Sequence, residues 1–562
     1  MRKKILMKIM TKDYIAFDTE TTDSNAHKAK LLGYSVAQEN RSFFSSTAPT
    51  GSLIWESSIV AHNGKYDAIV VSKNCGFTPE IHYDTMLAYY LLHIDRPRKL
   101  ETIVKDVFGV DKKDLQEVYN EATGETRKSL PSDWYLKVPE AMLAHYAEED
   151  VRWTYKLKEY CDEKFEKNPV LKDWFFNIEM PLLNILVQSE LQGVKLDVEE
   201  LKRLGEIFSR KKSELGAKLR RISGCPELNL NSSKQLQEVL YKKFKLKASR
   251  KTKTGFSTDT DALKKLDHHA FPKLLLEYKE LEKLLNSFVE PLLELAQEDG
   301  RIHCTFNQAL TRTRRFSCSD PNLQQIPSRS KLGQLIRGCF VASEGYKFLI
   351  ADYSQMEPRL LAHFSDDPLL IEWFRNGDDI YLKTSEFMSK KLGKEFTRSQ
   401  AKILQLSITY GKTSYGFAQD WGCTRQEAEQ ILNTYFQQFK RVKDYIQEQQ
   451  DECKANNGWV YSIAGLPLYV EGINSNDKWK YEEAMRQAVN YRIQASSQDI
   501  LKSAIVNIYN KLNAYPLLYV HDELVFEMTD LDPALIVDEM KSAWKLAVPL
   551  EVEFKISERW VK

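Results

Sequence analysis

The sequence lacks any run of about eighteen apolar residues, so we predict no membrane-spanning helix. Its first residues are basic and partly apolar, but Lys8, Lys12 and Asp13 interrupt the core that a signal peptide would need. The eight cysteines form no C-x-x-C pair, which argues against a zinc site and against a disulfide framework. Reduced thiols in the cytoplasm are the simplest interpretation.

The chain also lacks an excess of charge of either sign. It has 80 basic and 79 acidic residues, so a nucleic-acid partner must be sought in local patches. Residues 241–255, "YKKFKLKASRKTKTG", hold seven Lys or Arg residues and no acid. Such a run is usually a solvated face, but its Gly, Ser and Thr also fit a loop that follows a phosphate backbone. Within it we assign Lys251 and Lys253 as candidate DNA contacts.

The chain has no internal repeat and no long low-complexity linker. At 562 residues it exceeds a single hydrophobic core, so two or more domains are expected. Residues 13–160 alternate strand and helix patterns, which indicates a mixed α/β domain. Residues 170–300 are largely helical, and strands and helices mix again from 301, with a long helical section over 366–457.

A first set of acids lies in the mixed domain. "YIAFDTET" places Asp18 and Glu20 on the same face of a strand, and Asp67 follows in "AHNGKYDAIV". Tyr146 and Asp150 are four residues apart and share a helix face. Any one of these acids could be a helix cap or a surface charge. Together, four acids from separate elements are the oxygen ligands that two Mg²⁺ or Mn²⁺ ions need.

A second set of acids interrupts "LLYVHDELVFEM", residues 517–528. Because an unpaired buried carboxylate is costly, Asp522 and Glu523 need an explanation in so apolar a stretch. One interpretation is a hairpin with the polar turn His521-Asp522-Glu523, and the other is a metal-binding tip. The apolar strand pattern that ends at Asp352 would supply a second carboxylate for a two-metal site.

A stripe of helix residues lies between these acids in the sequence. Arg398, Lys402, Leu406 and Tyr410 follow at intervals of four, and each step drifts by about 40° around the helix. Two cations followed by an apolar and an aromatic residue suit a triphosphate followed by a base. The stripe is weak evidence alone, since Arg and Lys are good helix formers without a ligand.

The first acid set resembles the proofreading 3′–5′ exonucleases of the DnaQ-like, ribonuclease-H-fold group, in the subclass with a tyrosine in the third motif. This resemblance implies that the four carboxylates bind two cations and that Tyr146 orients the attacking water. The implied metal ligands are Asp18, Glu20, Asp67 and Asp150. Asp84, at the start of a helix pattern, is interpreted as a helix cap.

The remaining motifs resemble family A DNA polymerases, the group of bacterial DNA polymerase I. The similar segments include "DYSQMEPR", "VHDELVF", "RRFSCSDPNLQQIP" and "RQAVNYRIQASSQDILK". The resemblance spans the chain from about Asp13 to Trp560, in family order. It implies an α/β and α+β multidomain fold. A ribonuclease-H-like exonuclease domain (1–165) is followed by a right-hand polymerase (166–562). In the polymerase we expect a thumb at about 180–300, a palm at about 301–365 and 470–562, and fingers at about 366–469.

The same resemblance implies the roles of the polymerase residues. Asp352, Asp522 and the carbonyl of Tyr353 would ligate two Mg²⁺ ions, with Glu523 in support, and Lys402 would protonate the leaving pyrophosphate. The implied nucleotide contacts are Arg398, Lys402, Leu406, Tyr410, Gln355, Glu357 and Tyr381. The implied primer or template contacts are Arg315, Arg486, Asn490, Gln494 and His521.

Several residues depart from the family pattern. Leu406 stands where Phe or Tyr is usual, so we expect weaker stacking on the nucleotide and poor use of dideoxynucleotides. Tyr381 stands where a phosphate-contacting His is common, which puts that contact in doubt. Arg314 replaces a usual Gly, and we expect it to add a phosphate contact. Glu357 matches the family position that excludes a ribose hydroxyl, so DNA is the expected product.

The sequence therefore predicts a template-directed DNA polymerase with intrinsic proofreading, acting in DNA replication or repair. Two Mg²⁺ ions per site, with Mn²⁺ as a substitute, are the expected cofactors. The expected partners are primer-template DNA and dNTPs, and no membrane association is expected. We expect a monomer, and the sequence does not indicate a processivity factor. We expect no 5′-nuclease domain. We expect a source among bacteriophages or bacteria, and the compact layout favours a bacteriophage. The alternatives are an exonuclease whose polymerase half only grips DNA, and a structural DNA-binding subunit.

Overall fold

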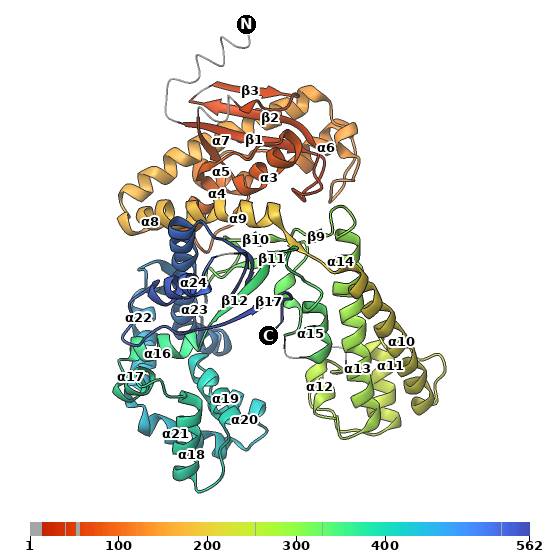
Figure 1. Ribbon diagram of the computed structural model, residues 1–562, viewed down its shortest axis with the longest axis vertical. Helices are drawn as coiled ribbons and strands as arrows, with labels where there is room; N and C mark the ends of the chain where they lie inside the picture. The colour runs from red at the N-terminus through yellow and green to blue at the C-terminus, as the bar shows by residue number, and fades with distance from the viewer. Residues whose placement is uncertain are drawn as a thin grey trace.

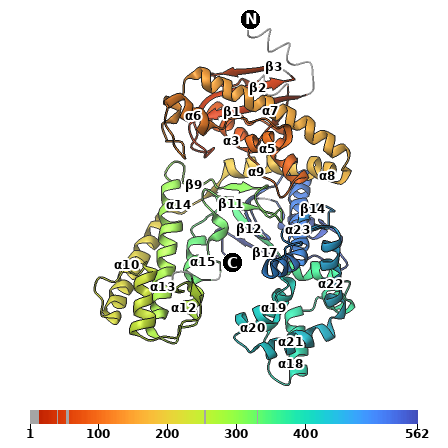
Figure 2. The same cartoon turned by 180° about the vertical axis from the view of Figure 1, so that it is seen from behind.

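The computed structural model describes residues 14–39, 41–51, 57–252, 255–328, 330–529 and 531–561. An N-terminal part with its own sheet lies at one end of the molecule (Figure 1). Below it, two helical arms extend on either side of a second, central sheet, as the view from behind also shows (Figure 2). The chain runs through the first arm, the central sheet and the second arm before it returns to the central sheet.

The N-terminal part contains a five-stranded sheet with the order β3-β2-β1-β4-β5. β1 pairs antiparallel with β2 and parallel with β4, so the sheet is mixed. The strands are β1 (Tyr14–Thr21), β2 (Leu31–Gln38), β3 (Arg41–Ser45), β4 (Ser58–Ala61) and β5 (Ile81–Asp84). The helices are α3 (Gly64–Cys75), α4 (Thr85–Leu92), α5 (Leu100–Phe108), α6 (Leu115–Thr123) and α7 (Glu140–Glu166). The predicted mixed α/β architecture is confirmed.

Burial explains why this sheet forms. The central strand β1 carries Ile15 and Phe17 at 2% and 0% exposure, and α7 packs across β1, β2 and β3. Asp84 caps α4 by accepting from Leu87 N at 3.0 Å, as the sequence predicts. Its second oxygen accepts from Gly64 N at 2.7 Å, so one buried carboxylate fixes the starts of both α3 and α4.

The first arm is helical, as expected for residues 170–300. The connection to it runs through α8 (Pro169–Trp174), η2 (Phe175–Glu179) and α9 (Met180–Gln192). The arm is built from α10 (Val198–Ser223), α11 (Ser233–Gln237), α12 (Thr260–Lys264), α13 (Ala270–Leu284) and α14 (Glu290–Leu295). In the basic segment, Lys251 is exposed on the short strand β7 (Lys251–Thr252). Lys253 lies outside the described residues.

The central sheet has the order β15-β16-β12-β17, and every neighbouring pair is antiparallel. Its strands are β15 (Pro516–Val520), β16 (Glu523–Met528), β12 (Lys347–Tyr353) and β17 (Val552–Ser557). The helices around it are α15 (Lys331–Arg337), α16 (Met356–Ser365), α23 (Lys478–Leu512) and α24 (Pro533–Ser542). Two short strands, β10 (Thr305–Asn307) and β11 (Ser317–Ser319), form a separate ribbon between this sheet and the N-terminal part.

The second arm confirms the predicted helical section over 366–457. It contains α17 (Pro368–Arg375), α18 (Ile380–Leu392), α19 (Arg398–Thr409), α20 (Ser414–Trp421), α21 (Arg425–Gln438) and α22 (Lys440–Ala455). The chain then forms the hairpin β13 (Trp459–Tyr461) and β14 (Pro467–Tyr469) before α23. No helix in the described ranges is long and apolar enough to cross a bilayer. All eight cysteines carry free thiols.

Candidate functional sites

The two predicted palm aspartates come together at one edge of the central sheet. Asp352, the last residue but one of β12, pairs with Glu523 of β16, and Tyr353 N donates to the carbonyl of Asp522 at 3.3 Å. His521 and Asp522 form the turn between β15 and β16, with His521 in the left-handed region at φ 59°. The hairpin with a polar turn is therefore confirmed, and the turn borders a cleft. Metal binding at this turn stays a prediction.

That cleft, of about 470 Å³, lies between the central sheet and the second arm. It brings together residues that are separated by up to 225 positions in the chain, from Ser328 to Glu553, including most of the predicted nucleotide contacts. The predicted residues that line it are Asp352, Tyr353, Gln355, Glu357, Tyr381, Arg398, Lys402, Leu406, His521, Asp522 and Glu523. The cleft therefore has a carboxylate side and a cationic side.

The cationic side comes from α19. Thr397 caps this helix and accepts from Gln400 N, so the helix begins at Arg398, next to the cleft. Arg398 Nε lies 2.7 Å from an oxygen of Asp379, while Lys402 is exposed. The Tyr381 ring lies 5.4 Å from the Arg398 guanidinium and 5.8 Å from the Lys402 ammonium. Tyr381 thus places both cations beside one aromatic face, an arrangement that a cation–π contact stabilises.

Glu357 connects the two sides of the cleft. Its side chain is 10% exposed, and it accepts from Arg315 Nη2 at 2.7 Å. The Tyr410 hydroxyl lies 3.4 Å from the same carboxylate oxygen. A predicted sugar-selecting residue, a predicted DNA contact and a predicted base-stacking residue therefore form one polar cluster.

Glu523 has support that the sequence analysis missed. Trp560 Nε1 donates to Glu523 Oε1 at 2.9 Å, and Arg337 Nη1 lies 3.5 Å from the same oxygen. The Arg337 guanidinium also lies 4.2 Å from the centroid of the Trp560 ring. Burial lowers the pKa of Arg337, while the charges of Glu523 and Asp352 oppose that shift. Neither residue belongs to a local pattern, so only the long-range packing reveals them.

The predicted DNA contacts on α23 are Arg486, Asn490 and Gln494. They are half-buried and follow at intervals of four, so they share one helix face. Gly411, at the end of the second arm's α19, has φ 61°, and a Cβ there would lie 3.2 Å from Arg486 Cα. The close approach seats the end of α19 directly on the helix that carries these residues.

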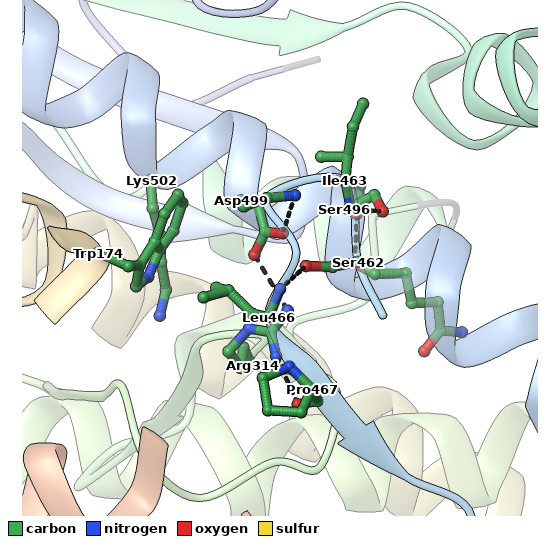
Figure 3. Close-up of polar contacts among 12 residues, drawn as sticks. Trp174, Arg314, Ser462, Ile463, Leu466, Pro467, Ser496, Asp499 and Lys502 are labelled. Atoms are coloured by element: carbon green, nitrogen blue, oxygen red, sulfur yellow. Dashed lines mark hydrogen bonds and ion pairs between the residues drawn. The ribbon is translucent and has the colours of Figure 1, made fainter. Parts of the chain in front are cut away.

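The expectation that Arg314 adds a phosphate contact is wrong. Figure 3 shows that its guanidinium lies in the interior beside Asp499 of α23. Arg314 Nη1 donates to the carbonyl of Pro467 at 3.2 Å, and its side chain is 1% exposed. A buried guanidinium that is paired with a carboxylate cannot reach a phosphate in the cleft.

The predicted exonuclease residues come from three elements of the N-terminal part. Asp18 and Glu20 lie on β1, Asp67 on α3, and Tyr146 and Asp150 on α7. The four acids interact electrostatically, which shows that they occupy one region.

Two of these acids have close polar partners at their oxygens. Thr19 holds Asp67 Oδ1 with its backbone N at 3.0 Å and its hydroxyl at 2.6 Å. Asp150 forms an ion pair with Lys112, a residue that the sequence analysis missed.

The electrostatics of this cluster fit divalent cations. Burial and the charge of Asp67 raise the pKa of Asp18 well above its usual range, and burial and Asp150 do the same for Glu20. Burial raises the pKa of Asp67 to about 7 and that of Asp150 to about 6. Glu20 Oε1 has no hydrogen-bond partner among the described residues. Buried carboxylates that repel one another would be stabilised by added positive charge.

The carboxylates are not closed around one point. Over the described ranges, no three or more His, Cys, Asp or Glu side chains are grouped so that they could hold a metal ion as they stand. This finding is consistent with the contacts of two of the acids, because Thr19 hydrogen-bonds to Asp67 and Lys112 pairs with Asp150.

Comparison with known proteins identifies the family. Residues 198–562 match DNA polymerase family A, and residues 2–166 match a 3′-5′ exonuclease family. DNA polymerase I of Bacillus subtilis is 35% identical over 97% of this chain, and that of Geobacillus stearothermophilus is 33% identical over 98%. The chain spans 63% and 64% of the lengths of these two relatives.

A solved structure supports the same conclusion. The POL domain of Pol1 from M. smegmatis, in complex with DNA primer-template and dNTP, aligns with a TM-score of 0.87 at 27% identity. The alignment covers 99% of this chain and 97% of that one, which confirms the predicted multidomain fold class. This chain belongs to DNA polymerase family A and carries an N-terminal domain of the 3′-5′ exonuclease family.

Proposed function

We infer that the chain is a template-directed DNA-dependent DNA polymerase with intrinsic 3′–5′ proofreading, acting in DNA replication on primer-template DNA and dNTPs. One observation carries this proposal: Asp352 and Asp522 border the same cleft as Arg398 and Lys402. Carboxylates for cations and cations for a triphosphate, in one cleft, are what nucleotidyl transfer requires.

The proposed cation ligands follow from the two acid sets. Asp352, Asp522 and the Tyr353 carbonyl would hold two Mg²⁺ ions, and Asp18, Glu20, Asp67 and Asp150 would hold another two, with Mn²⁺ as a substitute. When bound, the cations supply a more acidic attacking hydroxyl or water and stabilise negative charge at phosphorus.

The chain's own residues do the remaining work of synthesis. Arg398 and Lys402 bind the triphosphate, and Lys402 gives a proton to the leaving pyrophosphate. Glu357 fills the space beside the sugar 2′-carbon and excludes a ribose hydroxyl, while Tyr410 packs under the new base pair. Gln355, Tyr381 and Leu406 complete the nucleotide pocket.

The DNA contacts are also proposals. Arg315, Arg486, Asn490, Gln494 and His521 contact the primer or template near the cleft, and the basic strand β7 with Lys251 follows the phosphate backbone. Arg and Gln can sense pairing geometry through minor-groove acceptors that every correct pair presents.

In the exonuclease site, Tyr146 orients the water that attacks the terminal phosphodiester. Tyr146 and Asp150 lie one turn apart on α7, and the Lys112 ammonium contacts both side chains. This contact fixes the phenol next to the proposed ligands. We place the boundary between the exonuclease and polymerase domains at residues 165 and 166, near the end of α7. We also propose a monomer in the cytoplasm.

Primer extension tests both activities. With a matched primer, we expect dNTP incorporation by the wild type and by Asp18→Ala, and none by Asp522→Ala. With a mismatched 3′ end, we expect the wild type to remove the mismatch and extend, and Asp18→Ala to stall. If the wild type shortened primers but incorporated no dNTP, the chain would instead be an exonuclease with a DNA-gripping half. Equal extension by Asp522→Ala and the wild type would contradict the role of Asp522.

A further inference from the structure

A lysine occupies the exonuclease acid cluster. Lys112 lies between α5 and α6, and its side chain is 1% exposed. Its ammonium forms an ion pair with Asp150 and lies 4.3 Å from the centroid of the Tyr146 ring. It also donates to the carbonyl of Lys113 at 3.1 Å. The two side chains that this ammonium contacts are thus a proposed metal ligand and the proposed water-orienting phenol.

Lys112 connects Asp150 and Tyr146, which lie one turn apart on α7. Its ammonium pairs with the Asp150 carboxylate and lies over the Tyr146 ring. The two contacts of one buried ammonium therefore restrain both side chains. A buried ammonium without such partners would be strongly unfavourable, so the acids are the reason that a lysine is tolerated here.

The charges show what the lysine contributes. Lys112 acts on Asp18 and Glu20 as well as on Asp150, and in each case its charge lowers the carboxyl pKa against the effect of burial. When all four acids are ionised, the ammonium is a built-in counter-charge. It also contacts an oxygen of Asp150 that a bound cation would need as a ligand.

The opposite flank of the cluster is held differently. Asp67 accepts from Thr19 N and Thr19 Oγ1, which are neutral donors. Asp67 can therefore bind a cation without displacing a charge, whereas Asp150 must share its oxygens with Lys112. The two flanks should differ in cation affinity for this reason.

We propose that Lys112 is a positioning residue of the exonuclease site: it holds Asp150 and Tyr146 in their working arrangement, and it competes with a cation for Asp150. This inference rests on the proposed exonuclease function. It predicts two effects of opposite sign when the charge is removed: tighter cation binding and slower hydrolysis.

The test compares Lys112→Met, which keeps the length and loses the charge, with Lys112→Arg, which keeps the charge. Lys113→Met is the matched control, because Lys113 is an exposed neighbour that pairs with Glu121 at 2.7 Å, away from the acids. Mn²⁺ binding to the full chain is measured by calorimetry, and kcat and KM are measured on single-stranded DNA.

We expect Lys112→Met to bind Mn²⁺ about tenfold more tightly and to show a kcat about tenfold lower, the scale of one charge-assisted hydrogen bond. The KM for DNA should change little. Lys112→Arg should lie near the wild type in Mn²⁺ affinity and recover part of kcat, and Lys113→Met should match the wild type. Circular dichroism and thermal unfolding of the same preparations show that each variant is folded.

Two outcomes would overturn the inference. A faster exonuclease in Lys112→Met would make the lysine an inhibitor, and an unchanged Mn²⁺ affinity would make its role purely structural. If Lys112→Met fails to fold, Lys112→Arg still tests the inference. This variant keeps the charge, so an altered Mn²⁺ affinity would show that the charge of Lys112 does not set the cation affinity. Failure of the proposed exonuclease function would look different, because the wild type itself would then leave DNA intact. The Mn²⁺ affinities of the wild type and Lys112→Met would still test whether Lys112 competes with a cation.

Discussion

Arg314 Nη2 lies 3.2 Å from Asp499 Oδ1, and both side chains are at most 1% exposed. One turn further along α23, Lys502 forms a second buried ion pair with Glu179, at 2.7 Å. The first pair ties the segment that precedes Arg315 to the helix that carries the proposed DNA contacts (Figure 3). Arg315 is thereby held within reach of Glu357.

We predict that Arg314→Ala lowers the free energy of unfolding by about 3–5 kcal/mol, because it leaves the Asp499 carboxylate buried and unpaired. Arg312→Ala is the control, since Arg312 pairs with Glu471 at the surface. Exposed pairs of this kind contribute about 1 kcal/mol or less. Denaturant unfolding of both variants measures the difference, and equal losses would contradict the prediction.

The acids that we propose as cation ligands could be located from the sequence, because each one follows a short local pattern. Asp18 and Glu20 end a strand, Asp352 ends another, and the turn at Asp522 interrupts a third. Strand ends of one sheet meet at an edge, so a linear pattern is enough to bring such residues together. The stripe of residues on α19 could be predicted for the same reason, since helical spacing is a local pattern.

The residues that were missed depend on packing between distant segments. Trp560 reaches Glu523 across 37 positions, and Lys112 reaches Asp150 from an irregular segment. Arg314 shows the limit most clearly, because its position next to Arg315, a proposed DNA contact, suggests a second phosphate contact. Its φ of 56° turns the side chain away from the course that its sequence neighbours suggest.

Leu406 should control the use of dideoxynucleotides. It lines the cleft two turns after Arg398, and it has no hydroxyl to replace the missing 3′-hydroxyl of a dideoxynucleotide. We predict that Leu406→Tyr raises dideoxynucleotide incorporation relative to dNTP by about tenfold or more, the scale of one hydrogen bond. Leu406→Phe, which adds a ring without a hydroxyl, separates stacking from hydrogen bonding. Equal use of both substrates by the wild type would refute the premise.

Trp560 should affect the rate of synthesis through Glu523. Trp560→Phe keeps an aromatic ring beneath Arg337 but removes the donor to Glu523 Oε1. We expect kcat for dNTP incorporation to fall by about tenfold, with little change in KM, since Arg398 and Lys402 remain in place. Trp479→Phe, at an exposed position of α23, is the control. A raised KM at unchanged kcat would show that Trp560 acts on nucleotide binding instead.

The exonuclease acids should make stability depend on pH. Burial raises the pKa of Asp67 to about 7 and that of Asp150 to about 6, above the values near 4 of unfolded chains. A group whose pKa is higher in the folded state stabilises the fold fully only below its unfolded pKa. That stabilisation is lost as the pH rises through the folded pKa. In EDTA, the exonuclease domain should therefore unfold more easily at pH 8 than at pH 5.

Asp67→Asn isolates this effect, because the amide oxygen can still accept from Thr19 but carries no charge at any pH. We expect the variant to lose less stability than the wild type between pH 5 and pH 8, by about 1 kcal/mol or more. Thermal unfolding at several pH values across this range measures how stability changes with pH in the wild type and in Asp67→Asn. Added Mn²⁺ should stabilise the wild type most at pH 8, where its ligands are ionised, and should stabilise Asp67→Asn less. Parallel slopes in EDTA would show that Asp67 is already ionised at pH 5, and that the cluster needs no added charge to fold.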